Sequence, residues 1–320
     1  MRRLLLYVPA AVLVAALAAV EVPLVAIGPG HVREVLPLID VRHRRTYEPQ
    51  GRLFLTTVSI GRLTAFDAVA AWLDDDREVV TESDVFTPGV SIREFGRRSL
   101  SQMDESKTAA AVYVLTRLTA YPEEHGDGAL VQSVVEGTPA DGRLHPGETI
   151  VSVDGRPIDD ADDVGRAIDR AGTGRALRFE VTAEGRTDHV SIRPTILRGE
   201  PVIGVILVPG FPFEIRFESG DDGGPSAGLM WAIGLADLLT PGNLLAGRTV
   251  AGTGAVDAEG TVYGIGSVGH KVRAAARKGA EVFLLPRANL EEGRAAGVSL
   301  PLVPVDTIDD ALRYLEQGGT

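Results

Sequence analysis

A Gly-Gly-Pro-Ser turn at residues 223–226 is the feature that most restricts how this chain can fold. The two glycines can adopt backbone angles that are closed to other residues, and Pro225 has its φ angle already set for the first turn of a helix. Ser226 therefore enters a first turn whose backbone N–H groups lack partners and whose dipole is positive. We expect a helix over residues 225–239, with the serine at an end that can stabilise a developing negative charge.

A lysine at position 271 lies in a setting that favours its neutral form. A serine hydroxyl is a weak nucleophile and needs a base, whereas a lysine amine has an ordinary pKa of about 10.4. Lys271 follows an apolar and glycine-rich run, residues 263–268, and lies near the start of a predicted helix over residues 270–278. Burial and the positive end of a helix dipole both lower the pKa of an amine. Ser226 and Lys271 can therefore act together as nucleophile and general base.

The composition argues against several other classes of function. The 320 residues are enough for two or three domains, and the net charge of −12 argues against a nucleic-acid-binding protein, which would carry a basic face. The chain has no cysteine, so it offers no disulfide and no thiol nucleophile. Its six histidines lack the His-Glu-x-x-His spacing of a catalytic zinc site, and no Gly-x4-Gly-Lys-Ser/Thr phosphate-binding motif occurs. We therefore expect neither a metal nor a nucleotide cofactor.

The N-terminus has the pattern of a membrane signal. Two arginines precede an uncharged run over residues 4–20, and after Glu21 the apolar character resumes over residues 22–27. This length is sufficient to cross a hydrocarbon layer of about 30 Å, and the arginines should remain in the cytoplasm. We expect residues 1–28 to be a signal-anchor transmembrane segment, single-pass in the cell membrane, with the catalytic domain extracytoplasmic. The alternative is a signal peptide cleaved at the Ala-Leu-Ala sequence of residues 16–18.

Residues 29–120 form an N-terminal extracytoplasmic region whose patterns do not identify a family. One strand and two helices are expected there, over residues 53–58, 63–73 and 102–119. The second helix contains Ser106 and Lys107, but adjacent residues on a helix point about 100° apart. We therefore interpret this second serine–lysine pair as surface residues.

Residues 121–196 are expected to form a compact β-rich unit. Strands are predicted over residues 129–135, 147–153, 177–181 and 188–192, and a short helix over residues 161–171. Four aspartates gather at the N-terminal end of this helix, where the helix dipole favours negative charge. The Asp-Gly pair at residues 154–155 is a hairpin signal.

The middle of this unit carries an ordered set of motifs: Gly137-Thr-Pro-Ala140, Leu144, Pro146-Gly-Glu-Thr-Ile150 and Val153-Asp-Gly155. In this order they resemble a PDZ domain of the bacterial, protease-associated kind, with Glu148 in place of the usual aspartate. The resemblance implies that an extended peptide adds as a strand to an exposed sheet edge. We expect the loop before Ala129 to bind the peptide carboxylate. The alternative is a β-module that only spaces the next domain from the membrane.

Residues 200–320 alternate between strand and helix patterns. Strands are predicted over residues 202–208, 213–217, 249–251, 261–263, 281–286 and 302–305, and helices over residues 225–239, 270–278 and 307–316. Gly279 fits the left-handed position that commonly ends a helix, and Thr307 fits a helix cap. The alternation indicates a layered α/β or α+β domain.

The same domain contains a second ordered set of motifs: Gly224-Pro-Ser-Ala-Gly228, Gly252-Thr-Gly254, Gly260-x-Val262, Ile265-Gly266-x4-Lys271, Ala274-Ala275, Gly279-Ala280 and Leu284-Leu-Pro286-x-x-Asn289. In order and spacing they resemble the proteolytic domain of Lon-type serine proteases. The resemblance implies that Ser226 is the catalytic nucleophile and Lys271 the general base, and that Thr253 helps to hold the lysine. Three positions depart from the family pattern: Gly223 and Ala255 stand where acids are common, and Ser267 stands where a glycine is usual.

The order of a membrane segment, a PDZ-like unit and a Lon-like domain resembles the bacterial membrane-anchored PDZ–Lon-like proteases, which lack the ATPase domain of Lon. The implied fold is a multidomain α+β protein with an N-terminal transmembrane helix, a PDZ-like domain over residues 121–196 and a Lon-type proteolytic domain over residues 200–320. Lon-type domains often form hexameric rings, so the resemblance also leaves a homo-oligomer open.

The expected function is ATP-independent serine endopeptidase activity on extracytoplasmic proteins, carried by Ser226 and Lys271. The expected partners are protein or peptide substrates and a C-terminal peptide at the PDZ-like unit, with no nucleic acid. Two alternatives remain open. One is a membrane-tethered peptide-binding scaffold with an inactive protease domain. The other is an esterase of the α/β-hydrolase type, in which Gly224-x-Ser226-x-Gly228 is a nucleophile elbow and Asp257 and His270 complete a triad.

Overall fold

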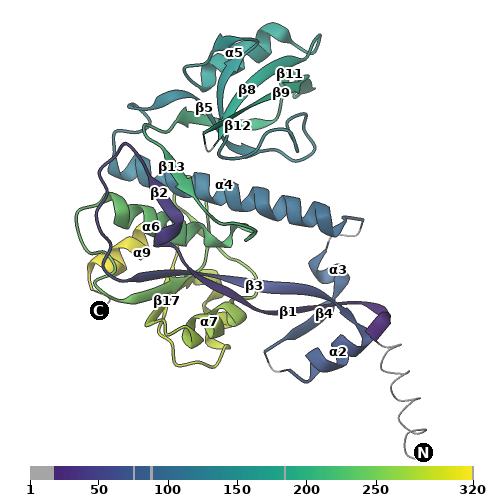
Figure 1. Ribbon diagram of the computed structural model, residues 1–320, viewed down its shortest axis with the longest axis vertical. Coiled ribbons are helices and arrows are strands. Elements are labelled where there is room, and N and C mark those ends of the chain that lie inside the picture. Colours follow the sequence, from purple (N-terminus) through teal and green to yellow (C-terminus); the bar gives the residue numbers. More distant parts are fainter. Residues whose placement is uncertain (1–17, 75, 87–88, 184, 319–320) are drawn as a thin grey trace, which may run out of the picture.

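One six-stranded sheet joins strands from both ends of the chain. A computed structural model describes residues 18–74, 76–86, 89–183 and 185–318, and the strand order of this sheet is β18-β17-β14-β3-β1-β4 (Figure 1). The strands span β1 (Glu21–Glu34), β3 (Arg52–Thr64), β4 (Glu78–Thr81), β14 (Thr249–Gly252), β17 (Val282–Pro286) and β18 (Leu302–Val305). β14 pairs in parallel with β3 and β17, whereas β1 pairs antiparallel with β3 and β4.

This topology differs from the predicted division between residues 29–120 and residues 200–320. The start of β3 pairs directly with β14, so the N-terminal strands complete the C-terminal sheet. Leu53 and Phe54 point to opposite faces of β3 and are both fully buried, as expected for a strand covered on its two faces. The predicted boundary between the two regions is wrong because β3, which forms hydrogen bonds along one edge of β14, comes from a distant part of the sequence. Local sequence patterns do not show which strands pair.

Helices cover both faces of this sheet. On one face α4 (Ile92–Leu118), α6 (Gly228–Leu239) and α9 (Ile308–Glu316) enclose a core around Trp231. On the other face α7 (Val268–Arg277) and α8 (Leu290–Arg294) pack over Phe54 and Phe283. The result is a layered arrangement that confirms the mixed α+β class.

The interpretation of Ser106 and Lys107 as surface residues is wrong. Both lie on α4, which is longer than the predicted helix and packs between α6 and the β-rich unit. Ser106 is buried, and its hydroxyl donates to the carbonyl of Pro225 at 2.7 Å. Lys107 is 9% exposed and pairs with Asp104 at 2.9 Å. At these two positions α4 is covered by neighbouring elements, so the pair does not lie on its solvent-exposed face.

The β-rich unit has its own sheet, with the order β12-β5-β6-β8-β9 and β7 paired to β6. Its elements are β5 (Gly126–Val134), β6 (Thr149–Val153), β7 (Arg156–Pro157), α5 (Ala161–Ala171), β8 (Leu177–Ala183), β9 (Arg186–Ile192) and β12 (Val205–Gly210). β12 was expected within the last domain, but it pairs antiparallel with β5. The half-buried Val205 and Leu207 pack against the core of the β-rich unit, and this apolar contact draws β12 into its sheet.

Shorter elements complete the fold. They are η1 (Leu36–Leu38), β2 (Ile39–Val41), α2 (Ala65–Trp72), α3 (Glu82–Val85), β10 (Thr195–Leu197), β11 (Glu200–Val202), β13 (Ile215–Phe217), η2 (Pro225–Ala227), β15 (Ala255–Val256), β16 (Val262–Tyr263) and η3 (Arg287–Asn289). β2 pairs with β13, β10 with β11, and β15 with β16.

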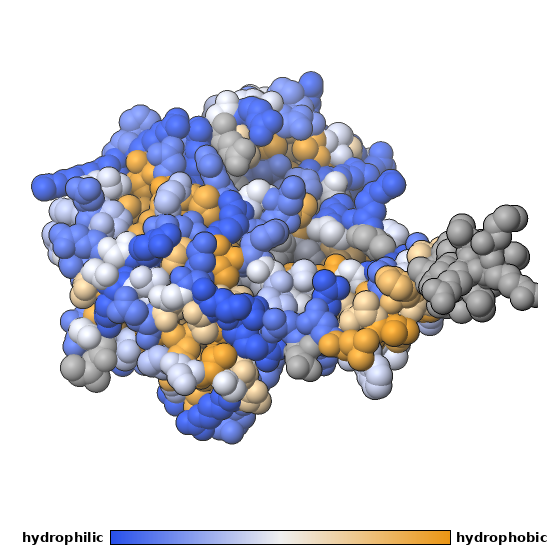
Figure 2. Space-filling view, turned by 60° about the horizontal axis from the view of Figure 1, so that its bottom comes forward, coloured by the Kyte–Doolittle hydropathy of each residue, from blue (hydrophilic) through white to orange (hydrophobic). Residues whose placement is uncertain are grey.

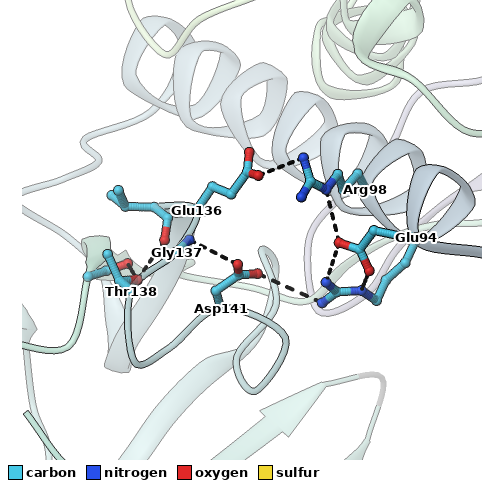
Figure 3. A network of polar contacts seen from close by, with 9 residues as sticks. Glu94, Arg98, Glu136, Gly137, Thr138 and Asp141 are labelled. Atoms are coloured by element: carbon cyan, nitrogen blue, oxygen red, sulfur yellow. Dashed lines mark hydrogen bonds and ion pairs between the residues drawn. The ribbon is translucent and has the colours of Figure 1, made fainter. Parts of the chain in front are cut away.

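Ion pairs join the β-rich unit to α4, as Figure 3 shows. Arg98 of α4 lies 2.6 Å from Glu136, and Arg97 lies 3.8 Å from Asp141. Both arginines also bind Glu94, and their hydrogen bonds, that of Arg97 first, hold the pKa of Glu94 below its usual range. These side chains are open to solvent, so each pair contributes little and is screened by salt.

The predicted transmembrane segment, residues 1–28, falls into two parts. Residues 1–17 lie outside the described residues. Residues 22–27 lie in β1, where β3 and β4 pair with them and Val25 and Ala26 are buried. A membrane-spanning helix that continues through residue 28 is therefore wrong, because the second apolar run belongs to a sheet. Within the part of the chain that the structure describes, no helix has the length and apolar character needed to cross a bilayer.

Candidate active site

Ser226 lies where a 3₁₀ turn, η2, leads into the buried helix α6. The predicted helix over residues 225–239 is thus divided into two parts. Gly224 has a φ of 89°, which favours glycine, and donates its N–H to the carbonyl of Ser99 at 2.7 Å. A Cβ on Gly223 would lie 2.8 Å from that of Ser99. The close approach of α4 therefore explains why a glycine replaces the acid that is common at position 223.

Arg33 holds the loop that precedes the turn. It extends from β1, and its Nη1 lies 2.6 Å from Oδ2 of Asp222 and also donates to the carbonyl of Ser219. The loop before Ser226 is thereby tied to the N-terminal part of the sheet. Arg33 could not be predicted as part of the site, because nothing in the local pattern of residues 29–34 indicates that β1 passes beside this loop.

Lys271 is almost completely enclosed near the start of α7. Lys271 is 3% exposed, and this burial lowers the pKa of its amine to about 7. The negative charge of Glu292 acts in the opposite direction but is the smaller influence. A buried amine without a compensating contact to a carboxylate favours its neutral form, which carries the lone pair that a general base needs.

The side chains of Ser226, Thr253 and Lys271 converge. Nζ of Lys271 lies 2.7 Å from Oγ of Ser226 and 3.1 Å from Oγ1 of Thr253. The Thr253 hydroxyl donates its proton to the carbonyl of Ser226 at 2.9 Å, so its oxygen accepts an N–H from the amine. That bond orients the neutral amine so that its lone pair can face the serine. Ser226 itself is only half-buried, so the nucleophile is accessible while the base is sealed from water.

Asn289 holds the segment that leads into α7. Its Oδ1 accepts the N–H of Ile265 at 2.9 Å, and its Nδ2 donates to the carbonyl of the same residue at 2.8 Å. Ser267, the next residue but one, begins the helix with a φ of 60°. In the sequence Asn289 is only the last residue of a motif, whereas in the structure its side chain supports the segment that enters the lysine helix α7.

The triad of the esterase alternative is not brought together. The Asp257 carboxylate accepts hydrogen bonds from Tyr263 and the N–H of Thr261. His270 is buried, its Nδ1 lies 2.9 Å from Nη2 of Arg273, and its Nε2 lies 3.7 Å from Glu78. In the described part of the chain, no group of three acidic or histidine side chains is placed to hold a metal ion.

Two segments of the chain match models of known protein families. Residues 116–193 match the model of the PDZ domain, and residues 219–315 match the model of the Lon protease (S16) C-terminal proteolytic domain. Residues 116–193 are therefore similar to PDZ domains, and residues 219–315 are similar to the proteolytic domain of Lon proteases. The second match includes both Ser226 and Lys271.

Individual relatives match only parts of the chain. Lon protease 1 of Myxococcus xanthus is 37% identical over 94 residues, and the Lon protease of Chloroflexus aurantiacus is 37% identical over 93 residues. Each match covers 28% of this chain and 11% of the relative, so the chain spans about a tenth of the curated Lon proteases that it matches. The solved PDZ domain of an SdrC-like protein from Listeria monocytogenes is 27% identical, with a TM-score of 0.25, and covers 26% of this chain and 90% of that domain.

A Thr253→Val substitution tests the role of the threonine. Valine keeps the shape of the side chain but cannot accept a hydrogen bond from Lys271, so we expect kcat to fall about 10- to 100-fold with KM little changed. Steady-state cleavage of a fluorogenic peptide measures both constants. Thr253→Ser retains the hydroxyl and should keep most of the activity. Equal losses in the two variants would show that the hydroxyl has no part in orienting the amine.

Proposed function

We propose that the protein is an ATP-independent serine endopeptidase with Ser226 as nucleophile and Lys271 as general base. The observation that carries the proposal is the 2.7 Å separation of their reactive atoms, with the lysine enclosed and its pKa lowered to about 7. Hydrolysis by such a pair needs no added metal or nucleotide.

The reaction proceeds by acyl transfer. Lys271 removes the hydroxyl proton while Oγ of Ser226 forms a bond to the carbonyl carbon of the substrate. The tetrahedral intermediate then collapses, the C–N bond breaks, and the protonated lysine transfers its proton to the leaving amine. Water attacks the resulting ester with the lysine again as base, which releases the acid and restores the serine.

Backbone N–H groups at the turn are suited to hold the oxyanion. Gly224 already donates its N–H to Ser99, and Gly228 donates its N–H back into the turn. The N–H groups of Ser226 and Ala227 lie beside the nucleophile, at the positive end of α6. We assign these two groups to the oxyanion, since donors at this position act where the charge develops.

A purified protein assayed on casein without ATP tests the proposal. Cleavage should occur, and Ser226→Ala should remove it while leaving the thermal unfolding temperature unchanged within a few degrees, because only a half-buried hydroxyl is lost. A wild-type protein that cleaves neither casein nor unfolded peptides would favour the tethered scaffold instead.

The PDZ domain is proposed to dock peptides along β12. β5 is paired on both sides, by β12 and β6, so the predicted carboxylate site in the loop before Ala129 does not adjoin a free strand edge. β12 is an edge strand and lies against α5. An extended peptide between β12 and α5 would add a strand to the sheet, with its carboxylate near the preceding residues 203–204.

A Leu207→Ala substitution tests this groove. Leu207 is half-buried beside the core of the domain, whereas the neighbouring Ile206 is 52% exposed and points to the other face of β12. We expect Leu207→Ala to weaken binding of a peptide with an apolar C-terminus about tenfold, as measured by fluorescence anisotropy. Ile206→Ala is the matched control and should bind normally. Undiminished binding of the C-terminally amidated peptide would argue against carboxylate capture.

We also propose that residues 4–20 anchor the protein in the cell membrane, with the protease outside the cytoplasm. The support is the uncharged run that follows the two N-terminal arginines. Loosely folded extracytoplasmic proteins are the proposed substrates.

A further inference from the structure

Helix α2 exposes a large apolar face. Phe66, Val69 and Leu73 have the i, i+3, i+7 spacing of one helix face and are 45%, 59% and 73% exposed, and the adjoining Trp72 is 80% exposed. Side chains of this size on a helix of a water-exposed domain normally point toward the core. The exposed apolar face of α2 therefore indicates a contact surface for lipid or for another protein.

The opposite side of α2 explains how the helix remains attached. Ala68 and Ala71 face the sheet and pack against Leu63 and Ala26. The small residues thus point inward and the large ones outward, which reverses the usual pattern of a surface helix. Thr64 and Asp67 form a reciprocal cap that fixes the start of the helix, so the apolar face is held in a defined orientation.

The apolar face is continuous with the N-terminal run of the sequence. The N–H of Ala65, the first residue of α2, donates to the carbonyl of Val20 at 2.9 Å, and Val20 is 55% exposed. Residues 4–20 are uncharged and lead directly to this point. Figure 1 places α2 beside the N-terminal end of β1, and in Figure 2 an apolar area lies at that end of the molecule.

The charges around the face indicate which lipid chemistry fits. Asp67 and Asp74 border it, and the nearby Arg77 is already paired with Asp74. Among the residues that the structure describes, the border therefore offers no basic cluster that would bind anionic headgroups. Insertion of apolar side chains at the boundary between headgroups and acyl chains requires no such cluster, and tryptophan is favoured at that depth.

We propose that the exposed face of α2, formed by Phe66, Val69, Trp72 and Leu73, lies in the interface of the lipid bilayer. The proposal rests on the membrane anchoring by residues 4–20 proposed above. The proposed anchor of residues 4–20 and the apolar face of α2 would give the protein two membrane contacts at its N-terminal end. The N-terminal strands would then be held against the bilayer, and the active site on the C-terminal part of the same sheet would be held at a set distance from it.

Tryptophan fluorescence of the full chain in phosphatidylcholine vesicles tests the proposal. The chain has two tryptophans, and Trp231 is fully buried, so the difference between the wild type and Trp72→Phe isolates the emission of Trp72. Vesicles made with phosphatidylcholine brominated on its acyl chains should quench roughly half or more of that emission, because the ring lies at the depth of the bromine. The double substitution Val69→Ser with Leu73→Ser should reduce this quenching at least about twofold. Ile196→Ser with Leu197→Ser, which changes two exposed apolar residues of β10, is the matched control and should leave it unchanged.

The other outcomes overturn the inference in distinguishable ways. If the protein floats with the vesicles but the brominated lipid does not quench Trp72, the anchor stands and the contact of α2 with lipid is refuted. If Trp72 is shielded from acrylamide but not quenched by the brominated lipid, a second copy of the chain covers the face instead. If the protein does not float with the vesicles, both the anchor and the lipid contact are refuted.

Discussion

Replacement of Lys271 by methionine is expected to lower kcat for peptide cleavage by about 10⁴-fold or more. Methionine fills a similar volume but removes the amine that lies 2.7 Å from Oγ of Ser226. Without a base, the serine hydroxyl stays protonated at neutral pH and attacks the carbonyl slowly. Single-turnover and steady-state assays on a fluorogenic peptide would measure the loss.

Loss of folding would not explain such a result, because Lys271→Met removes a buried amine and leaves no unpaired polar group in its place. A buried amine destabilises the folded state whenever it is protonated, so Lys271→Met should unfold at the same temperature as the wild type or a higher one. Lys278→Met is the matched control, since Lys278 is exposed at the end of the same helix. Retention of activity within about tenfold in Lys271→Met would show that another group accepts the proton.

The pH profile is the second large effect. Because the pKa of Lys271 is lowered to about 7, kcat/KM for a neutral peptide should rise about tenfold per pH unit below pH 7 and level off above it. The direction follows from the chemistry, since the neutral amine is the active form and protonation removes it. Assays from pH 5 to 9 in buffers of constant ionic strength would record the inflection.

Glu292 offers an internal control for this profile. Its negative charge raises the pKa of Lys271, so Glu292→Gln should move the inflection to lower pH. The same pKa also affects stability. Between pH 7 and the ordinary lysine pKa of 10.5, the unfolded chain binds the proton that the folded protein lacks, so the free energy of unfolding should rise with pH across this window. A profile that is flat from pH 5 to 9, or an inflection near 10, would contradict the proposed base.

Several elements could be predicted because their signals are local. The helix of residues 161–171 agrees with α5 at both ends, since a row of aspartates marks its start and a glycine its end. Gly279 has a φ of 83° directly after the last turn of α7, as its position predicted. The motifs around Ser226 and Lys271 were sufficient to recognise the Lon-type domain, which the family comparison confirms.

Other features depended on which segments pair in space. The N-terminal strands join the C-terminal sheet, β12 joins the PDZ sheet, and Ser106 is buried against Pro225. In each case a short apolar or polar segment has several partners that would satisfy it equally well, and its own periodicity does not distinguish them. The same holds for the exposed face of α2, whose apolar spacing predicts a buried face.

The sequence by itself thus determined which chemistry can be proposed for this protein, because the nature and order of the residues around Ser226 and Lys271 are properties of the chain. Only the tertiary structure decided that their reactive atoms meet, that Thr253 orients the amine, and that Arg33 steadies the loop before the serine. The physical reason is that hydrogen bonds and burial act over a few ångströms, whereas the residues they join are distant along the chain.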